Sequence, residues 1–585
     1  MLLLGLASAA TVELVRDTFP VHEKVTVQLL VTAGPEGLHP GDQVRIEEPQ
    51  FHGMRWAKWG YLQTDPELCV ELSEDSDRPS VGLVRASAPG LELRVRHNVD
   101  GPGIHQEGRV DVEVISGELQ EGEQLLVELG VLGNDCGWQT SDRALDRIPL
   151  KTWLNEQSLG APELRFAGVP QVDSTQVVLP SQGVVGEPLT LRRVDLDRYG
   201  NVLSVEIEAI VFEEPGVFRV EDSNPIRVTV EPPALSVYWG DLHTHHGHSY
   251  TLDDGSHFDA NHDYARSVGF DFGCESVKAF PTELRYAEVW EANQRSCREL
   301  TDESYVALLG FEWMGGGQQG HHNVYFDGCE APLAPQALET LDDGLWPYVE
   351  QVMEESGLRA VTVPHAPSYT GFNWESRDDE LRPLVEVYSE WGSSMDPADA
   401  GSVPQALSQG HKLGFIASSD NHDGWLGNGL ASKNVAGGVA AIVATELSPA
   451  ALLDAMSSRS TYATTGARIL LDLQVHDGDV LEWSVHGTEV VREVHLMAVG
   501  VGSPEPAVSL ATSFPGALDA SGSFAVPWGP EELVVWLEVG QVDRHQAWSS
   551  PIWLEREAVD PRGCSSAPWW SGLLLPLIVL VRWRT

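Results

Sequence analysis

Two patterns of hydrophobic and polar positions divide the chain near residue 235. Upstream of this point, short runs rich in Val, Leu and Ile alternate with turns that contain Gly, Pro and Asp, as at residues 204–212. Short strands separated by such turns are typical of antiparallel β-sandwiches. The pattern therefore predicts two β domains within residues 11–235, the first at 11–157 and the second at 158–233.

From residue 236 onward, apolar strand-like runs alternate with amphipathic helical segments. Residues 281–300, 345–356 and 448–457 have the apolar spacing of helices. Alternation of this kind indicates βα units around a parallel sheet or barrel, so we expect an α/β domain at 236–470. Strand-like patterning returns downstream and predicts a small C-terminal β region at 471–556.

Composition narrows the class of protein. The chain has 585 residues, of which 87 are acidic and 37 basic, for a formal net charge of −50. Such a surface repels nucleic-acid phosphates, so we expect no DNA or RNA partner. The six cysteines include no C-x-x-C pair, which argues against a zinc ribbon or a thioredoxin-type motif. Cys69 with Cys136, and Cys297 with Cys329, are candidate disulfides of an exported protein.

Both ends of the chain point to export. Residues 1–10 have a short apolar run followed by small residues, as at the cleavage site of a signal peptide, although a basic n-region is missing. Residues 560–585 place an apolar stretch between Cys564 and two terminal arginines, and resemble the C-terminal sorting tails of some Gram-negative surface proteins. The alternative is a buried terminal strand or helix. We expect a periplasmic or cell-surface protein that contacts a membrane only through this tail.

Histidine or carboxylate side chains follow five apolar runs between residues 236 and 430. The carboxyl ends of strands converge on one face of a (β/α) barrel, so these groups are expected to meet. Residues i and i+2 of a strand point to the same side, which makes His243 with His245, and Asp420 with His422, two chelating pairs. Imidazole and carboxylate together suit Zn, Fe or Mn. The groups in question are His243, His245, Glu312, His365, Glu386, Glu390, Asp420 and His422.

The segments YWGDLHTH, GFEW, HHNVYF, VPHAPS, VEVYSEWGSS and GFIASSDNH occur in this order along the chain. Together they resemble the PHP (polymerase and histidinol phosphatase) superfamily, and within it a poorly characterised branch of unknown function. The resemblance extends from residue 236 to about residue 475. It implies a distorted (β/α)7 barrel, two or three divalent transition-metal ions (Zn, Mn or Fe), and hydrolysis, usually of phosphate esters. Upstream, residues 186–230 resemble Ig-like modules, so the second β domain is expected to be Ig-like.

The same resemblance implies which residues bind the metal ions. An acidic ligand soon after the first motif is expected at Asp253, with His248 and Asp254 as competitors. His322 competes with His321 for the position after the bridging carboxylate. The ligands carried over from the family motifs are His243, His245, Glu312, His321, His365, Asp420 and His422.

One motif departs from the family pattern. Where the family has Thr-Asp-His, this chain has Cys274-Glu275-Ser276. Glu275 is a candidate replacement for the aspartate, whereas Ser276 is a poor replacement for a metal-binding histidine. The third metal site is therefore in doubt, and two ions are the expected working number.

These residues predict a metal-dependent hydrolase. We expect a phosphoesterase that attacks a small phosphate ester with a hydroxide bridging the ions. His422 and His321 are the candidate acids for the leaving group, while Ser418 and Ser419 shape the metal loop. Two alternatives remain: hydrolysis of carboxyl esters, carbamates or amides at the same centre, and a surface binding or adhesion protein whose centre has decayed.

Overall fold

The computed structural model describes most of the chain. The described residues are 10–47, 61–63, 81–100, 107–132, 136–140, 143–245, 256–279, 286–315, 318–335, 338–422, 425–427, 437–476, 480–526 and 532–554. Most of the predicted signal sequence, the C-terminal tail, Cys69, and Asp253 with its competitors lie outside these ranges. Within them, no helix combines the length and the apolar character that a membrane crossing requires.

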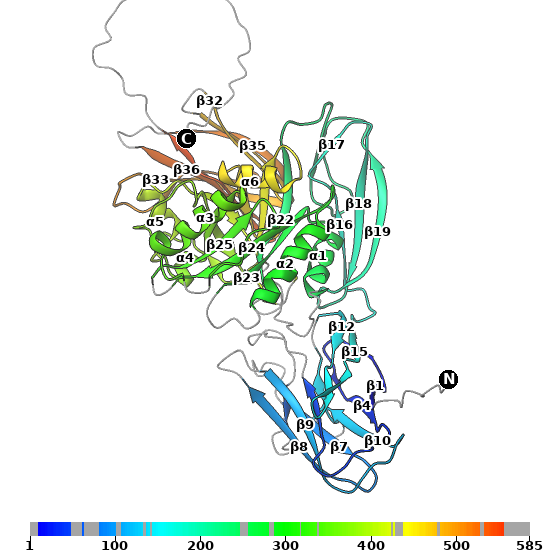
Figure 1. Ribbon diagram of the computed structural model, residues 1–585. Helices are drawn as coiled ribbons and strands as arrows, with labels where there is room; N and C mark the ends of the chain where they lie inside the picture. Colours follow the sequence, from blue (N-terminus) through cyan, green and yellow to red (C-terminus); the bar gives the residue numbers. More distant parts are fainter. Residues whose placement is uncertain are drawn as a thin grey trace, which may run out of the picture.

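The N-terminal part is a β-sandwich (Figure 1). Two five-stranded sheets, β1-β4-β10-β7-β6 and β14-β13-β5-β9-β8, are accompanied by a two-stranded and a three-stranded sheet. Alternate residues of their strands enter one shared core, which explains the sequence pattern. The strands are β1 (Thr11–Leu14), β2 (Thr18–Pro20), β3 (Lys24–Val25), β4 (Val27–Thr32), β5 (Gln43–Glu47), β6 (Tyr61–Gln63), β7 (Val81–Ser87), β8 (Glu92–Asp100), β9 (Glu107–Ser116), β10 (Gln124–Leu129), β11 (Trp138–Gln139), β12 (Leu145–Pro149), β13 (Thr152–Leu154), β14 (Gln157–Gly160) and β15 (Glu163–Ala167).

A second β unit follows, in two three-stranded sheets around a small core. The first unit extends beyond the boundary expected at residue 157, because β15 pairs with β12 and β2. A boundary between strands of similar pattern cannot be read from periodicity, which does not say which strands pair. The strands of the second unit are β16 (Ser174–Val178), β17 (Gln182–Val184), β18 (Pro188–Leu196), β19 (Val202–Val211), β20 (Gly216–Phe218) and β21 (Ile226–Thr229).

The central region contains the helices. The sequence predicted three of these helices, and the structure confirms them as α2, α3 and α6. The elements are β22 (Ser236–Thr244), α1 (Ser256–Ser267), β23 (Phe272–Lys278), α2 (Tyr286–Leu300), β24 (Val306–Met314), β25 (His321–Phe326), η2 (Leu341–Leu345), α3 (Trp346–Ser356), β26 (Ala360–His365), α4 (Pro367–Thr370), β27 (Leu384–Ser389), β28 (Gly392–Ser393), α5 (Val403–Ser408), β29 (Gly414–Ala417), β30 (Val439–Ala444), α6 (Pro449–Ser457) and β31 (Thr461–Thr464).

The central strands curl so that the first and the last of the site-bearing segments are neighbours. β22, β23 and β24 are parallel, and so are β26, β27 and β29. Between these groups, β25 runs antiparallel to both β24 and β26. A parallel bridge between Thr244 and Asn421 then joins the segment after β29 to the end of β22. Strand ends from both parallel groups therefore meet at one place.

Each central strand has an inner and an outer face. The inner residues Leu242, Cys274 and Leu308 belong to one buried cluster. The outer residues Val277 and Phe311 pack instead in the cluster that includes α2 and α3. Both faces are buried, as is usual for strands covered by helices. This alternation decides which side chains of a strand can reach the site.

The C-terminal strands do not form a separate sheet. The central strands and those of the predicted β region at 471–556 make up one 17-stranded sheet, and β31 pairs directly with β37. The strand content matches the sequence pattern, but the continuity depends on long-range pairing. These strands are β32 (Leu470–His476), β33 (Val480–Gly500), β34 (Val508–Ser513), β35 (Ala517–Ala525), β36 (Leu533–Gln541), β37 (Gln546–Ser549) and β38 (Ile552–Leu554).

Of the two predicted disulfides, the one whose cysteines both lie among the described residues is present. Cys297 in α2 is bonded to Cys329, which lies after β25, and their Cα atoms are 5.7 Å apart. The bond closes a loop that includes β24 and β25. It therefore ties the helix to the strands that carry two of the candidate ligands, Glu312 and His321.

Candidate metal centre

The predicted ligands lie at the ends of the central strands. His243 is the last residue but one of β22, and His245 is the first residue after this strand. Glu312 is near the end of β24, and His365 ends β26. In the antiparallel register, His321 of β25 stands opposite His365. The pairing of the strands, rather than closeness in sequence, brings these side chains together.

Eight histidine and carboxylate side chains form four overlapping groups, within each of which the ligand-type atoms lie within 4.8 Å of one another. They include every ligand that the family motifs assigned among the described residues, with Glu386 in addition. The groups are His243, His365, Glu386 and Asp420; His243, His245 and Glu312; His245, Asp420 and His422; and Glu312, His321 and His365.

Two carboxylates are shared between these histidines. Glu312 Oε1 lies 3.1 Å from His321 Nδ1 and 3.2 Å from His365 Nε2, while its Oε2 lies 3.3 Å from His245 Nε2. Asp420 Oδ1 lies 3.3 Å from Nε2 of both His243 and His245. Carboxylates with an oxygen on each side of a site are suited to bridging two cations.

The orientation of His243 and His245 favours a cation between them. His245 Nδ1 donates to the carbonyl oxygen of Ser276 at 2.8 Å, because a carbonyl can only accept. Burial and the charge of Lys278 lower the pKa of His245 to about 4, so its ring is neutral and its Nε2 carries a lone pair. This Nε2 faces His243 Nε2 at 3.2 Å, while His243 Nδ1 lies 3.0 Å from Glu386 Oε2. A carboxylate on the far nitrogen is a common way to orient a ligand histidine.

Several buried polar atoms of the centre are placed to bind a cation. Among the described residues, Glu312 Oε2, His365 Nδ1 and His422 Nδ1 have no hydrogen-bond partner. Buried polar atoms are normally hydrogen-bonded, and each exception calls for an explanation such as an ion. Imidazole nitrogen and carboxylate oxygen are the donors that Zn, Mn and Fe accept. The side chains therefore fit divalent transition metals.

Metal binding is expected to release protons and to strengthen as the pH rises from about 6 to about 9. Burial lowers the pKa of His365, but its contacts with Asp420 and Glu312 outweigh burial and raise that pKa to about 10. The metal-free centre thus keeps a proton on His365 across this range, and a cation must displace it. Calorimetric titration with Zn in two buffers of different ionisation enthalpy measures the release. Affinity that does not change with pH would contradict this account.

Asp241 holds the two chelating segments in register, a role that the sequence analysis missed. Its buried carboxylate accepts hydrogen bonds from the backbone N–H of His243, Ser419 and Gly427 at 3.1, 3.0 and 2.7 Å. The Ser419 hydroxyl donates to it as well, so this serine shapes the loop as expected. The Asp in the D-x-H-x-H motif was the available signal.

Asp420 has a backbone conformation that few residues other than glycine adopt, with φ of 51°. Its N–H donates to the carbonyl of His243 at 2.6 Å, and the N–H of His245 donates to the carbonyl of Asn421 at 2.8 Å. These two bonds hold the turn against the end of β22. Backbone strain of this kind often occurs where a site requires a particular side-chain direction.

The structure does not bring Glu275 to the centre. Its carboxylate accepts from Asn261 Nδ2, and its carbonyl accepts from Asn293 Nδ2 at 3.1 Å, so it faces α1 and α2. Successive side chains of a strand point to opposite faces, and Glu275 is one residue out of phase with the site. Ser276 is in phase, but its hydroxyl donates to the carbonyl of Leu242.

Lys278, two residues further along the same face of β23, enters the centre instead. Its Nζ donates to His422 Nε2 at 2.9 Å and lies 4.0 Å from Glu312 Oε2. Lys278 was not among the site residues predicted from the sequence. The only indication in the sequence was its spacing of two residues from Ser276, which places both side chains on the same face of the strand.

The two histidines proposed as acids differ in their surroundings. Burial, together with Lys278, holds the pKa of His422 well below its usual range, so its ring is neutral and accepts from lysine. His321 is at the rim, with 21% of its side chain exposed. Its neighbour His322 is buried on the other face of β25, with its ring centroid 5.7 Å from that of Trp313. The geometry favours His321 over His322 as a ligand and over His422 as a proton donor.

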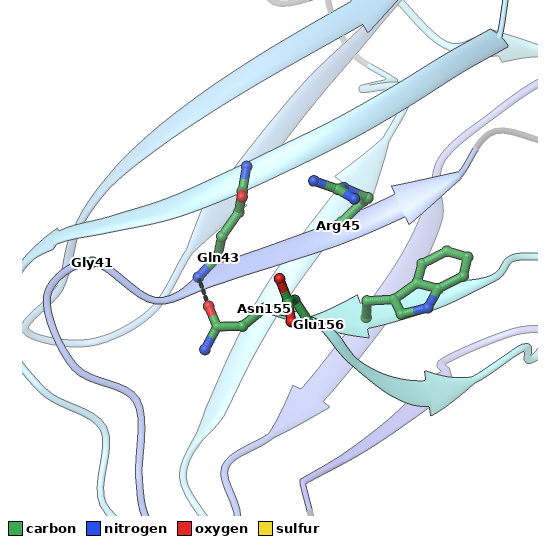
Figure 2. A pocket seen from close by; sticks show the side chains of 6 residues that line it. Gly41, Gln43, Arg45, Asn155 and Glu156 are labelled. Atoms are coloured by element: carbon green, nitrogen blue, oxygen red, sulfur yellow. Dashed lines mark hydrogen bonds between the residues drawn. The ribbon is translucent and has the colours of Figure 1, made fainter.

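A separate hollow of about 480 Å³ lies on the N-terminal sandwich (Figure 2). Gln43 and Arg45 come from β5, while Asn155 and Glu156 come from the turn between β13 and β14. The N–H of Gln43 donates to Asn155 Oδ1 at 2.9 Å. Apart from Trp153, the side chains that line the hollow are polar, which suits a polar ligand. It shares no residue with the metal centre.

Comparisons with known proteins find relatives without an assigned activity. The model of DUF3604, a protein family of unknown function, matches residues 427–512, downstream of every candidate ligand. An uncharacterised protein of Chlamydia pneumoniae is 24% identical over 414 residues, which are 59% of this chain and 63% of that protein. An uncharacterised protein of Chlamydia trachomatis is 22% identical over 401 residues, with the same coverage. The match thus spans less than two thirds of either relative.

One solved structure with partial likeness is a two-domain protein of Bacteroides vulgatus that contains a predicted PHP-like metal-dependent phosphoesterase. It is 13% identical, with a TM-score of 0.31, and the match covers 55% of this chain and 98% of that one. This likeness is too low to carry an argument about fold or activity. What the chain does has to be inferred from its own side chains.

Proposed function

We propose that this chain is a metal-dependent phosphoesterase with a centre for two divalent transition-metal ions, Zn, Mn or Fe. The observation that carries the proposal is the meeting of histidines from separate strand ends around two shared carboxylates, Glu312 and Asp420. We also propose that the central strands are a variant of the PHP-type barrel and that the preceding β units are Ig-like. Export, with a signal sequence at 1–10 and a surface tail at 560–585, belongs to the same proposal.

The position of each residue in the centre indicates its proposed role. His243, His245, Glu312, His365 and Asp420 would hold the ions, with Glu386 orienting His243 through its Nδ1–H. When bound, the ions would supply Lewis acidity and activate water near neutral pH. His321 lies at the partly exposed rim, where it can donate a proton to a leaving oxygen.

Metal analysis of the purified full chain, followed by assays on two model substrates, tests the proposal. We expect about two equivalents of Zn, Mn or Fe per chain, and hydrolysis of bis(4-nitrophenyl) phosphate that chelation removes and metal restores. The variant His243→Ala should lose both metal and turnover. The matched control His262→Ala changes a buried histidine bonded to Tyr305 outside the centre, and should keep both.

The alternatives predict other results. Hydrolysis of 4-nitrophenyl acetate without any phosphodiester turnover would show a carboxyl-ester hydrolase. A chain that binds no metal even after reconstitution would overturn the enzyme proposal. The hollow around Arg45 and Trp153 would then be the first place to look for a bound ligand.

A further inference from the structure

Lys278 is a charged side chain in an unusual place. It is the last residue of β23, only 10% of its side chain is exposed, and its Nζ lies among the candidate ligands. Removing an ammonium group from water is unfavourable unless other groups compensate its charge. Bound metal ions would also repel the ammonium group. If the side chain had no function, the protein would be more stable with an apolar residue at this position.

Two contacts of the ammonium group are those of a cation. Its Nζ is 2.9 Å from His422 Nε2 and 4.0 Å from Glu312 Oε2, one imidazole nitrogen and one carboxylate oxygen. Both residues also belong to the groups that can hold a metal ion. Lysine therefore occupies space and ligand atoms that an additional ion would need.

The strand that carries Lys278 supplies no side-chain ligand to the groups. Ser276 faces the centre but donates to the carbonyl of Leu242, and Glu275 faces the helices. Neither residue belongs to any of the four groups of ligand-type atoms. Among its side chains, β23 thus contributes one positive charge to the centre, while the carbonyl of Ser276 orients His245.

We propose that Lys278 takes the place of a metal ion. The centre binds two ions, and the ammonium group takes the place of a third between His422 and Glu312. This inference rests on the proposed function. Among the described residues, the three carboxylates of the centre, two divalent ions and one ammonium sum to a net charge of about +2, which attracts an anionic ester more than a neutral one. The substrate class is therefore anionic phosphate esters.

The test compares Lys278→Met with the wild-type full chain, and measures metal binding first. Methionine keeps an unbranched stem and removes the charge. We expect Zn to bind at least tenfold more tightly in competition with a chelator, because a neighbouring positive charge has gone. A ligand or a purely structural residue would give the opposite sign. Weaker or unchanged Zn binding in the folded variant overturns the inference.

Activity supplies the second readout. In Lys278→Met we expect turnover of bis(4-nitrophenyl) phosphate to fall about a hundredfold, whereas any turnover of the neutral 4-nitrophenyl acetate changes less than threefold. Lys278→Arg keeps the charge and should keep Zn affinity within threefold. Lys412→Met, which removes an exposed lysine, is the control and should match the wild type.

The wild-type metal content separates this inference from the proposed function, even if Lys278→Met does not fold. Two ions per chain support both. Three ions in a chain that retains Lys278 overturn the replacement of an ion by lysine and leave the phosphoesterase proposal standing. No metal after reconstitution overturns the phosphoesterase proposal itself.

Discussion

Replacing Glu312 with glutamine is expected to strip the metal centre and lower phosphodiester turnover by about three orders of magnitude. Its two oxygens contact His321, His365 and His245, so it is one of the two carboxylates through which the groups are joined. Glutamine has nearly the same shape but no charge, and its NH₂ group cannot bind a cation. Metal content by elemental analysis, and kcat with added metal, measure the effect.

Glu275→Gln is the matched control for this variant. Both glutamates are buried on neighbouring strands, but Glu275 faces Asn261 and α1 rather than the histidines. Glutamine can still accept the hydrogen bond from Asn261, so metal content should stay at the wild-type level. If Glu275→Gln loses metal to the same extent as Glu312→Gln, the assignment of ligands by strand face is wrong.

Asp241→Ala is expected to lower the free energy of unfolding by about 3–5 kcal/mol and to weaken metal binding more than tenfold. Burial raises the pKa of Asp241 to about 6 against four hydrogen bonds that lower it, so the group is mainly a carboxylate at pH 7. Alanine leaves the buried N–H groups of His243, Ser419 and Gly427 without this acceptor. It also releases the Asp420 turn from the end of β22.

Urea unfolding of the metal-free chain and chelator competition measure these two effects. Asp271→Ala is the control. Asp271 lies directly before β23, away from the ligands, and its carboxylate accepts a hydrogen bond from the backbone N–H of Trp239. It should lose stability and keep its metal affinity. Equal loss of affinity in both variants would mean that Asp241 acts on stability alone.

Much of the site could be predicted from local pattern. The pairs His243 with His245, and Asp420 with His422, were predicted from a spacing of two, and the structure places all four side chains in the groups of ligand-type atoms. Glu312 and His365 were predicted from their position at the end of apolar runs. Such signals depend on the geometry of one strand, which a few consecutive residues determine.

The error at Glu275 and the omission of Lys278 have one cause. The sequence shows that β23 is a strand but not which of its two faces looks into the site. Its residues are all buried, so the usual contrast of apolar and polar positions is absent. A shift of one residue exchanges the faces, and only packing against α2 on one side and the histidines on the other decides between them.

Local pattern was enough to predict the strand-rich upstream part, helices α2, α3 and α6, the Cys297–Cys329 pair as a candidate and the residues able to bind metal. Tertiary packing was needed for the continuity of the C-terminal strands with the central sheet, the part played by Asp241, the preference for His321 over His322, and the charge that Lys278 brings to the centre. The two kinds of feature differ in the separation along the chain over which the interactions act. Propensity and periodicity act within a few residues, whereas the site depends on pairing and burial between segments far apart in the chain.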